Sequence, residues 1–175
     1  MIENLETKFK QITELSDDVN LTIYPITEHI GFDIRTEEKN NLGEVFTPIQ
    51  LIDKMLETSH PKPTEKNMDL CAGRGQFTIR MLRKFINENK DFNIQSYLSN
   101  NHWFNEFNIE NAKDIIKIFG EDINLCIGDA RLLKDIPNNK DGNWDNGIWI
   151  YDGRWYKTKA DNLNYRHNNF FNFED

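Results

Sequence analysis

The chain has 175 residues, a length that suits one domain and leaves little room for a second. Its net charge of -8 argues against a domain that holds nucleic acid by itself, because basic side chains that neutralise phosphates supply most of that affinity. The sequence shows no apolar leader and no run of apolar residues that could cross a membrane, so we expect a soluble, cytoplasmic protein without membrane contacts.

Cysteine and histidine spacing disfavours a metal centre. Cys71 and Cys126 form no CxxC pair, and the four histidines show no metal-ligand spacing. We therefore predict no metal site and two reduced, buried thiols.

Two helices are predicted in the first third of the chain. Apolar residues recur every three or four positions from Ile2 to Leu15, which indicates an amphipathic helix, and residues 20–41 are predicted to be irregular. Thr47 is expected to cap a second helix, with Pro48 in its first position. Four residues are expected to form the apolar face of this helix: Ile49, Ile52, Met55 and Leu56.

The middle of the chain alternates strands and helices. Strands are predicted over residues 67–72, 103–109, 123–127 and 144–151. A helix should follow Gly75, with Phe77, Met81, Leu82, Phe85 and Ile86 on its buried side. A further helix over 110–119 should turn inward Ala112, Ile115, Ile116 and Phe119. This alternation predicts an α/β fold with a parallel sheet.

The turn Gly73-Arg74-Gly75 lies between a predicted strand and a predicted helix. Glycines there allow a ligand to approach the backbone closely, and the helix start presents free N–H groups. Many such turns use glycine for backbone geometry alone, and that alternative stays open. Thr78 replaces the third glycine of the dinucleotide fingerprint, which disfavours NAD.

Two segments resemble the adenine-N6 DNA methyltransferases. Residues 69–77, Asp-Leu-Cys-Ala-Gly-Arg-Gly-Gln-Phe, are similar to the family's first motif, Asp/Asn-Pro-x-Ala-Gly-x-Gly-x-Phe/Leu, with Leu70 in place of the proline. Upstream, Gly43-Glu44-Val45-Phe46-Thr47-Pro48 resembles the family's Gly-x-x-Phe-Thr-Pro segment. The resemblance covers roughly residues 43–151. It implies a Rossmann-like fold that binds S-adenosylmethionine.

The resemblance also implies the residues that bind the cofactor. The first motif would contribute Asp69, Cys71, Ala72, Gly73 and Gly75, and the upstream segment would lay Phe46, Thr47 and Pro48 across the methionine end. Glu106 would bind both ribose hydroxyls, which requires an insertion around residues 87–101; a solvated Glu is the alternative. Asp129 would accept from the adenine amino group; a helix N-cap or turn is the alternative.

The family's catalytic Asp/Asn-Pro-Pro-Tyr/Phe motif has no match. The strand that starts at Trp144-Asp145 is taken as the equivalent strand, but it leads to Asp152-Gly153-Arg154, and the chain contains no Pro-Pro. Asp152 with Trp155 or Tyr156 is one imitation of the motif, yet no catalytic residue is assigned. The sheet is expected to stop after about four strands.

These observations divide the chain into an N-terminal helix and irregular segment (1–40), a methyltransferase-like cofactor-binding domain (41–156) and an Asn- and Phe-rich tail (157–175). Two functions compete. One is part of an adenine-N6 DNA methyltransferase, inactive alone, whose protein partner completes the sheet and contacts DNA. The other is a non-catalytic, regulatory module of a methyltransferase or restriction system. Basic and aromatic residues interleave near the C-terminus, which indicates a nucleic-acid contact or a solvated loop: Arg154, Trp155, Tyr156, Lys157, Lys159, Tyr165 and Arg166.

Overall fold

The computed structural model describes residue 47 and residues 49–89, 91–138 and 142–164. The predicted helix at residues 2–15, the segment 20–41, Phe46, Pro48 and the tail from residue 165 lie outside these residues. The chain forms two compact units. One comprises residues 1–62 and 76–92, and the other residues 63–75 and 93–175. The three predicted domain ranges stay predictions.

The first unit contains α4 (Ile49–Ser59) and α5 (Gln76–Glu88), both predicted. The guanidinium of Arg80 in α5 donates two hydrogen bonds, of 2.8 and 2.7 Å, to the carboxylate of Asp53 in α4. α4 buries Ile52 and Leu56 as predicted, but Met55 is 46 % exposed, so its expected burial is wrong. Helical spacing explains the error, because Met55 shares an exposed stripe with Leu51, four residues earlier.

The buried face of α5 is close to the expected one. Met81, Leu82 and Phe85 are buried, while Phe77 and Ile86 are only half-buried and Ile79 is buried in addition. Leu82 and Phe85 are fully inaccessible. The apolar stripe is therefore rotated slightly from the predicted one.

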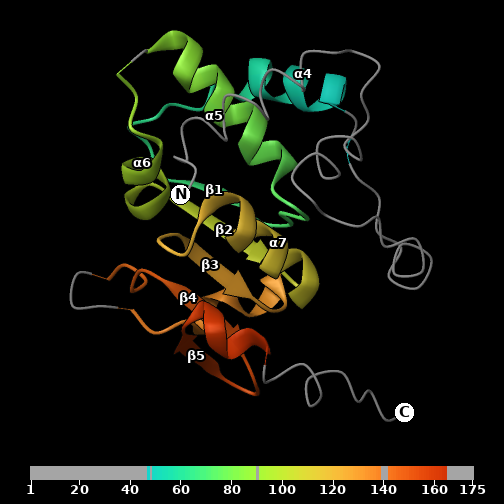
Figure 1. Cartoon of the computed structure of the whole chain (residues 1–175), viewed down its shortest axis with the longest axis vertical. Coiled ribbons are helices and arrows are strands. Elements are labelled where there is room, and N and C mark those ends of the chain that lie inside the picture. The colour runs from blue at the N-terminus through green and yellow to red at the C-terminus, as the bar shows by residue number, and fades with distance from the viewer. Residues whose placement is uncertain (1–46, 48, 90, 139–141, 165–175) are drawn as a thin grey trace, which may run out of the picture. The chain divides into compact units, whose positions relative to one another are not determined.

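In the part of the chain that the structure describes, the second unit is built on a five-stranded sheet with strand order β1-β2-β3-β4-β5, as Figure 1 shows. The strands are β1 (Asn67–Asp69), β2 (His102–Glu106), β3 (Asn124–Ile127), β4 (Ile148–Tyr151) and β5 (Trp155–Thr158). The first four run parallel, and β5 returns antiparallel to β4. The predicted α/β fold with a parallel sheet is confirmed, and β5 is an addition that the sequence pattern did not indicate.

Side-chain caps start two helices, and one of them ends the second predicted strand early. Asn108 accepts a hydrogen bond from the N–H of Glu110 at 2.9 Å and so starts α7 (Ile109–Phe119) directly after β2. Asn93 likewise accepts from Ser96 at 2.8 Å and starts α6 (Ile94–Asn100), a helix within the predicted insertion. In α7, Ile118 is buried and Ile116 only half-buried, a change from the expected inward set.

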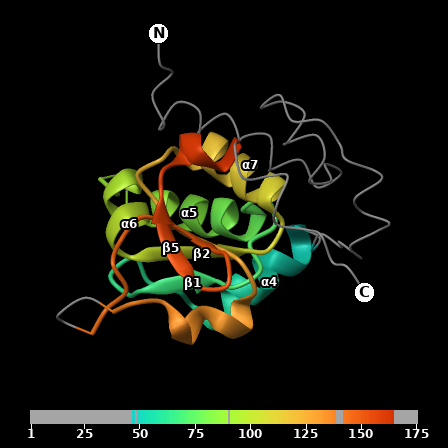
Figure 2. The same ribbon diagram turned by 90° about the horizontal axis from the view of Figure 1, so that it is seen from below.

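The sheet of the second unit carries apolar side chains on both faces. On one face Phe104 packs against Phe119 of α7, with ring centroids 5.0 Å apart. On the other face Cys126, Trp149 and Trp155 form a buried cluster with Leu133 and Ile136, at the 3-10 helix η1 (Ala130–Asp135). Figure 2 shows η1, in orange, on the side of the sheet away from α7. The unit is thus a three-layered α/β structure.

The strand order departs from that of a doubly wound sheet after β3. In such sheets the fourth strand starts on the free side of the first one. Here β4 pairs with β3 instead, Ile127 opposite Ile150, and among the described residues no strand pairs with the free side of β1. The interpretation of residues 144–151 as the family's catalytic strand is therefore wrong.

No helix in the part of the chain that the structure describes is long and apolar enough to cross a membrane.

Candidate functional site

The glycine turn after β1 requires its glycines. The N–H of Gly75 donates to the carbonyl of Ala72 at 2.7 Å, which closes the turn. Gly73 and Gly75 have φ angles of 55° and 86°, in the left-handed region that favours glycine. A Cβ on Gly75 would lie 2.5 Å from Cε2 of Phe119. Backbone geometry and packing against α7 therefore account for Gly75, and backbone geometry accounts for Gly73.

Glu106 holds this turn from the end of β2. One of its carboxylate oxygens accepts from the N–H of Gly73 at 2.6 Å, and the other accepts from the N–H of Asn108 at 2.7 Å. The Ala72 N–H also donates to the carbonyl of Asn105 at 2.9 Å. Glu106 is only 8 % exposed, so it is not the solvated side chain that the alternative interpretation assumed. The structure brings Glu106 and the first motif together, while its ribose contact stays a prediction.

Arg74, to which the sequence pattern gave no role, ties the turn to α7. Its Nε lies 3.2 Å from a carboxylate oxygen of Asp114, and the two side chains are 4 % and 15 % exposed. A buried guanidinium is held only where a carboxylate and hydrogen bonds compensate its lost hydration. The turn is thus anchored to β2 and to α7.

Asn105 is a second residue that the sequence pattern missed. Its side-chain N–H₂ group donates to the carbonyls of Leu70, at 3.0 Å, and Gly128, at 3.3 Å. The N–H of Gly128 donates in turn to the carbonyl of Glu106 at 3.0 Å. A buried amide within a strand of aromatic residues is the signal that could have found it.

Asp129 follows β3 and caps η1. Its carboxylate accepts from the N–H of Arg131 at 2.9 Å and pairs with the guanidinium of the same residue. The hydrogen bonds from the side chain of Arg131, and to a lesser extent from its backbone N–H, lower the pKa of Asp129 to about 2. The N-cap alternative describes its contacts, and binding of the cofactor's adenine by Asp129 remains a prediction.

Apolar and thiol side chains lie exposed at the same end of the sheet. Leu70 follows β1 and is 53 % exposed, and Phe107 follows β2 and is 45 % exposed. Cys71 is exposed, so the expectation of two buried thiols is wrong for this one. The turn begins one residue before Cys71 and lifts it out of the sheet. Cys126 is buried, and burial raises the pKa of its thiol to about 12.

The imitation of the catalytic motif around Asp152 has no support in the geometry. Trp155 is buried, and its indole N–H donates to the carbonyl of Leu132 at 2.9 Å, so its ring is not available to stack on a base. The guanidinium carbon of Arg154 lies 4.5 Å from the centre of the Tyr156 ring. Asp152 lies in the turn of the β4–β5 hairpin, where its N–H donates to the carbonyl of Arg154.

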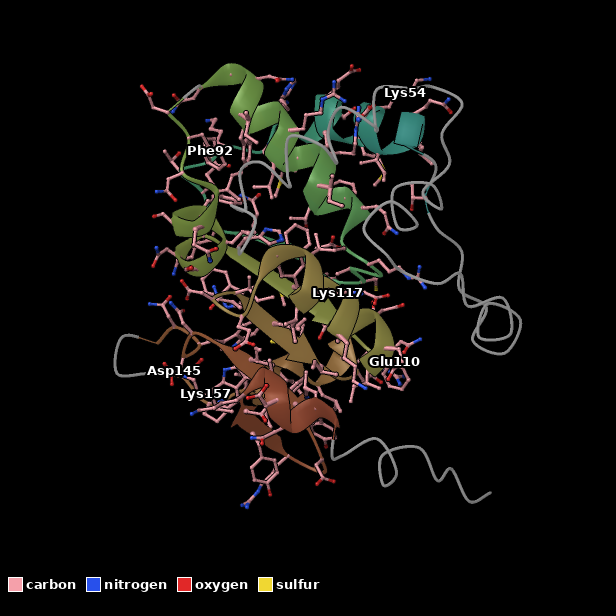
Figure 3. All side chains as sticks on the ribbon, viewed as in Figure 1. Lys54, Phe92, Glu110, Lys117, Asp145 and Lys157 are labelled. Atoms are coloured by element: carbon pink, nitrogen blue, oxygen red, sulfur yellow. The ribbon has the colours of Figure 1, made fainter. Side chains whose placement is uncertain are left out.

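The start of the predicted fourth strand has a structural role. Asp145 pairs with Lys157 of β5 at 2.8 Å, and Figure 3 labels both residues side by side. Thr47, the only described residue of the upstream segment, is exposed and belongs to the first unit. No group of three metal-binding side chains occurs among the residues that the structure describes, and the expected absence of a metal stays a prediction.

These features define a class: an α/β domain whose candidate site is a glycine turn and a buried glutamate at the carboxyl ends of parallel strands. Comparison with protein-family models identifies the family. The model of the N-6 DNA methylases matches residues 26–126, more than half of the chain, and the chain belongs to this family. The matched segment includes the turn and Glu106 and ends within β3, so Asp129, β4 and β5 lie outside it. Searches of curated proteins and of solved structures found no match.

Proposed function

We propose that the chain binds S-adenosylmethionine at the carboxyl ends of β1 to β3 and is the cofactor-binding part of an adenine-N6 DNA methyltransferase. The observation that carries the proposal is the contact of 2.6 Å between the N–H of Gly73 and the carboxylate of Glu106. It joins the first motif, which carries the family resemblance, to Glu106, the residue that the resemblance implies for the ribose. Ligands of open α/β sheets bind at this end of the strands.

The residues at this end fit the cofactor's chemistry. A carboxylate accepts up to about four hydrogen bonds, so Glu106 can hold two backbone N–H groups and still receive ribose hydroxyls. Phe107 and Leu70 expose apolar surface beside it, suited to cover the planar adenine. The glycine turn would hold the methionine part through its backbone. The bound cofactor supplies an activated methyl group, and no residue of this chain is assigned to its transfer.

Turnover would need a strand beside β1 that carries the Asp/Asn-Pro-Pro-Tyr motif. The described residues place no strand there, and the sequence contains no Pro-Pro. We propose that a protein partner provides this strand and the contact with DNA. By itself the chain would be inactive.

A non-catalytic, regulatory module is the second candidate. The hairpin β4–β5 favours it, because this hairpin extends the sheet past β3 and lies outside the segment that matches the family. The two candidates differ in their response to a motif-bearing partner. Only the first gains methylation of adenine in DNA when the partner is added.

Calorimetric titration with S-adenosylmethionine and S-adenosylhomocysteine tests the shared part of both candidates. Gly73→Asp should abolish binding, since it adds a negatively charged side chain beside Glu106 at a left-handed residue. Gly120→Asp is the matched control: Gly120 is also left-handed, with φ 87°, and a Cβ there meets nothing within 4 Å. It should bind like the wild type. A folded wild-type chain that binds neither ligand would refute the proposal.

Cys71 offers a second readout that needs no mutation. Its exposed thiol lies in the turn, so bound cofactor should slow its alkylation by iodoacetamide. Buried Cys126 should stay unmodified in both states and serves as the internal control. Equal alkylation rates with and without saturating S-adenosylhomocysteine would show that the ligand does not cover this turn.

A further inference from the structure

Asn105 connects three neighbouring strands at the end of the sheet where the candidate site lies. It belongs to β2 and is 2 % exposed. Its N–H₂ group reaches the carbonyl of Leu70, just after β1, and that of Gly128, just after β3. One side chain on the middle strand therefore spans the chain segments that leave both outer strands.

The orientation of this amide follows from its partners. Both contacted atoms are carbonyl oxygens, which only accept, so the N–H₂ group of Asn105 must face them. Its Oδ1 is then fixed on the other side, where it is buried and has no hydrogen-bond partner among the described residues. Buried polar atoms without a partner are rare in native structures. The amide thus holds the two carbonyls while its own acceptor stays unsatisfied.

Asn124 is the internal comparison, at the opposite ends of the strands. It is also fully buried, in β3. Its N–H₂ group donates to the carbonyls of Leu98, Ser99 and His102, and its Oδ1 accepts from the N–H of Gly147 at 3.0 Å. Asn124 therefore satisfies both ends of its amide, as expected of a residue whose role is stability.

Asn105 and Glu106 act on the same turn from consecutive positions of β2. The carboxylate of Glu106 accepts a hydrogen bond from the N–H of Gly73. The backbone carbonyl of Asn105 accepts from the N–H of Ala72, and its side-chain amide donates to the carbonyl of Leu70. Consecutive side chains of a strand point to opposite faces. The turn is therefore held from both faces of β2, by one carboxylate and one amide.

We propose that Asn105 is a positioning residue of the cofactor site. Its amide sets the spacing between the ends of β1 and β3 and so fixes the glycine turn in the conformation that receives the ligand. The residue acts through the turn and through Gly128, without touching the cofactor. This inference rests on the proposed function for its effect on cofactor affinity, while its effect on the turn is independent of any ligand.

The test compares Asn105→Ser with Asn124→Ser in the full chain. Both substitutions shorten a buried amide to a hydroxyl, so both should lower stability in urea. Three quantities are measured for each: the urea midpoint, the affinity for S-adenosylhomocysteine and the alkylation rate of Cys71 without ligand. Asn105→Ser should weaken binding about tenfold and speed alkylation of the folded protein about tenfold, because the turn loses its preorganisation. Asn124→Ser should change neither by more than about twofold.

A second variant tests the inference if Asn105→Ser folds poorly. Asn105→Gln keeps both N–H donors on a side chain one methylene longer, and it should lie between wild type and Asn105→Ser in affinity and alkylation rate. Any unstable variant is measured in trimethylamine N-oxide, which favours burial and folding. Wild-type behaviour of Asn105→Gln or Asn105→Ser in both readouts would overturn the inference.

Two further outcomes separate this inference from the proposed function. If both serine variants weaken binding and speed alkylation equally, Asn105 only contributes stability, and the inference is wrong while cofactor binding stands. If the wild type does not bind S-adenosylhomocysteine, the proposed function fails. The alkylation rate of Cys71 then still decides whether Asn105 fixes the turn.

Discussion

The two ends of the parallel strands in the second unit are built differently. At the amino ends, the side-chain N–H₂ group of Asn124 donates hydrogen bonds and its Oδ1 accepts one. At the carboxyl ends, Asn105 leaves a buried oxygen without a partner among the described residues, and Gly73 has a left-handed backbone. Leu70 and Phe107 add exposed apolar surface there.

The difference between the two amides agrees with the proposal that the carboxyl ends hold the cofactor, while Asn124 serves stability. A buried acceptor without a partner costs about 1–3 kcal/mol of stability, and left-handed or strained residues add to that cost. Such costs gather at functional sites, where the local arrangement serves binding. At the amino ends Gly147 is also left-handed, with φ 122°, but Asn124 has partners for both ends of its amide, so its substitution should change stability and leave binding intact.

The largest effect is expected at the amino ends. Asn124→Leu removes the donor of three backbone carbonyls and the acceptor of the Gly147 N–H, so it should lower the free energy of unfolding by about 3 kcal/mol. Urea unfolding measures the loss. The folded fraction should bind S-adenosylhomocysteine with wild-type affinity. A large loss of affinity for S-adenosylhomocysteine in this variant would contradict the proposed difference between the amino and carboxyl ends of the strands.

A somewhat smaller effect is expected at the turn. Gly75→Ala adds a Cβ at 2.5 Å from the Phe119 ring and at a left-handed residue, which should cost about 2 kcal/mol. Gly120→Ala isolates the backbone part of this cost, since its Cβ meets no atom within 4 Å. It should cost about 1 kcal/mol. Phe119→Leu should recover part of the Gly75→Ala loss, and equal losses for the two alanines would exclude the packing explanation.

An effect smaller than that of Gly75→Ala is a pH dependence that starts at the amino ends. His102 begins β2 and lies against the rings of Tyr97 and Phe104, and its burial lowers the pKa to about 3. As the pH falls below about 6.5, His102 becomes protonated in the unfolded chain but stays neutral in the folded chain. Protonation of His102 therefore favours the unfolded chain, and the free energy of unfolding falls from its full value above pH 6.5 as the pH decreases toward 3. The expected loss between pH 7.5 and 5.5 is about 1.4 kcal/mol.

His102→Phe is the control for this prediction. It removes the buried titrating group, so its stability in urea should fall less between pH 7.5 and 5.5 than that of the wild type. Exposed His60 remains in both proteins and cannot account for the difference. Identical pH dependence of the two proteins would show that His102 is protonated in the folded chain.

The features that the sequence predicted are those that short-range patterns encode. Apolar periodicity located α4, α5 and α7, and the glycine turn with its flanking strand indicated the candidate site. Glu106 could be predicted as a site residue because the resemblance implies an acidic residue at the end of the second strand. The two backbone N–H groups that donate to Glu106 could not be predicted, because hydrogen bonds of this kind leave no periodic signal in the sequence.

What the sequence pattern missed depends on neighbours in space. β5 is four residues long and pairs with β4 through a three-residue turn, too short to show a clear alternation. The pairing of β4 with β3 is a choice between two sheet edges, and no local pattern encodes it. Arg74 and Asn105 look like turn and strand-edge residues in the sequence, and only their burial reveals that they anchor the turn.

The antiparallel β5 has a consequence for how this protein would respond to a companion chain. Among the described residues β5 and β1 are the two edge strands of the sheet, and a strand from another molecule that joins beside β1 would arrive next to the glycine turn. Assembly and cofactor binding would then be thermodynamically linked. If the companion raises the affinity for the cofactor, the cofactor must raise the affinity for the companion by the same factor.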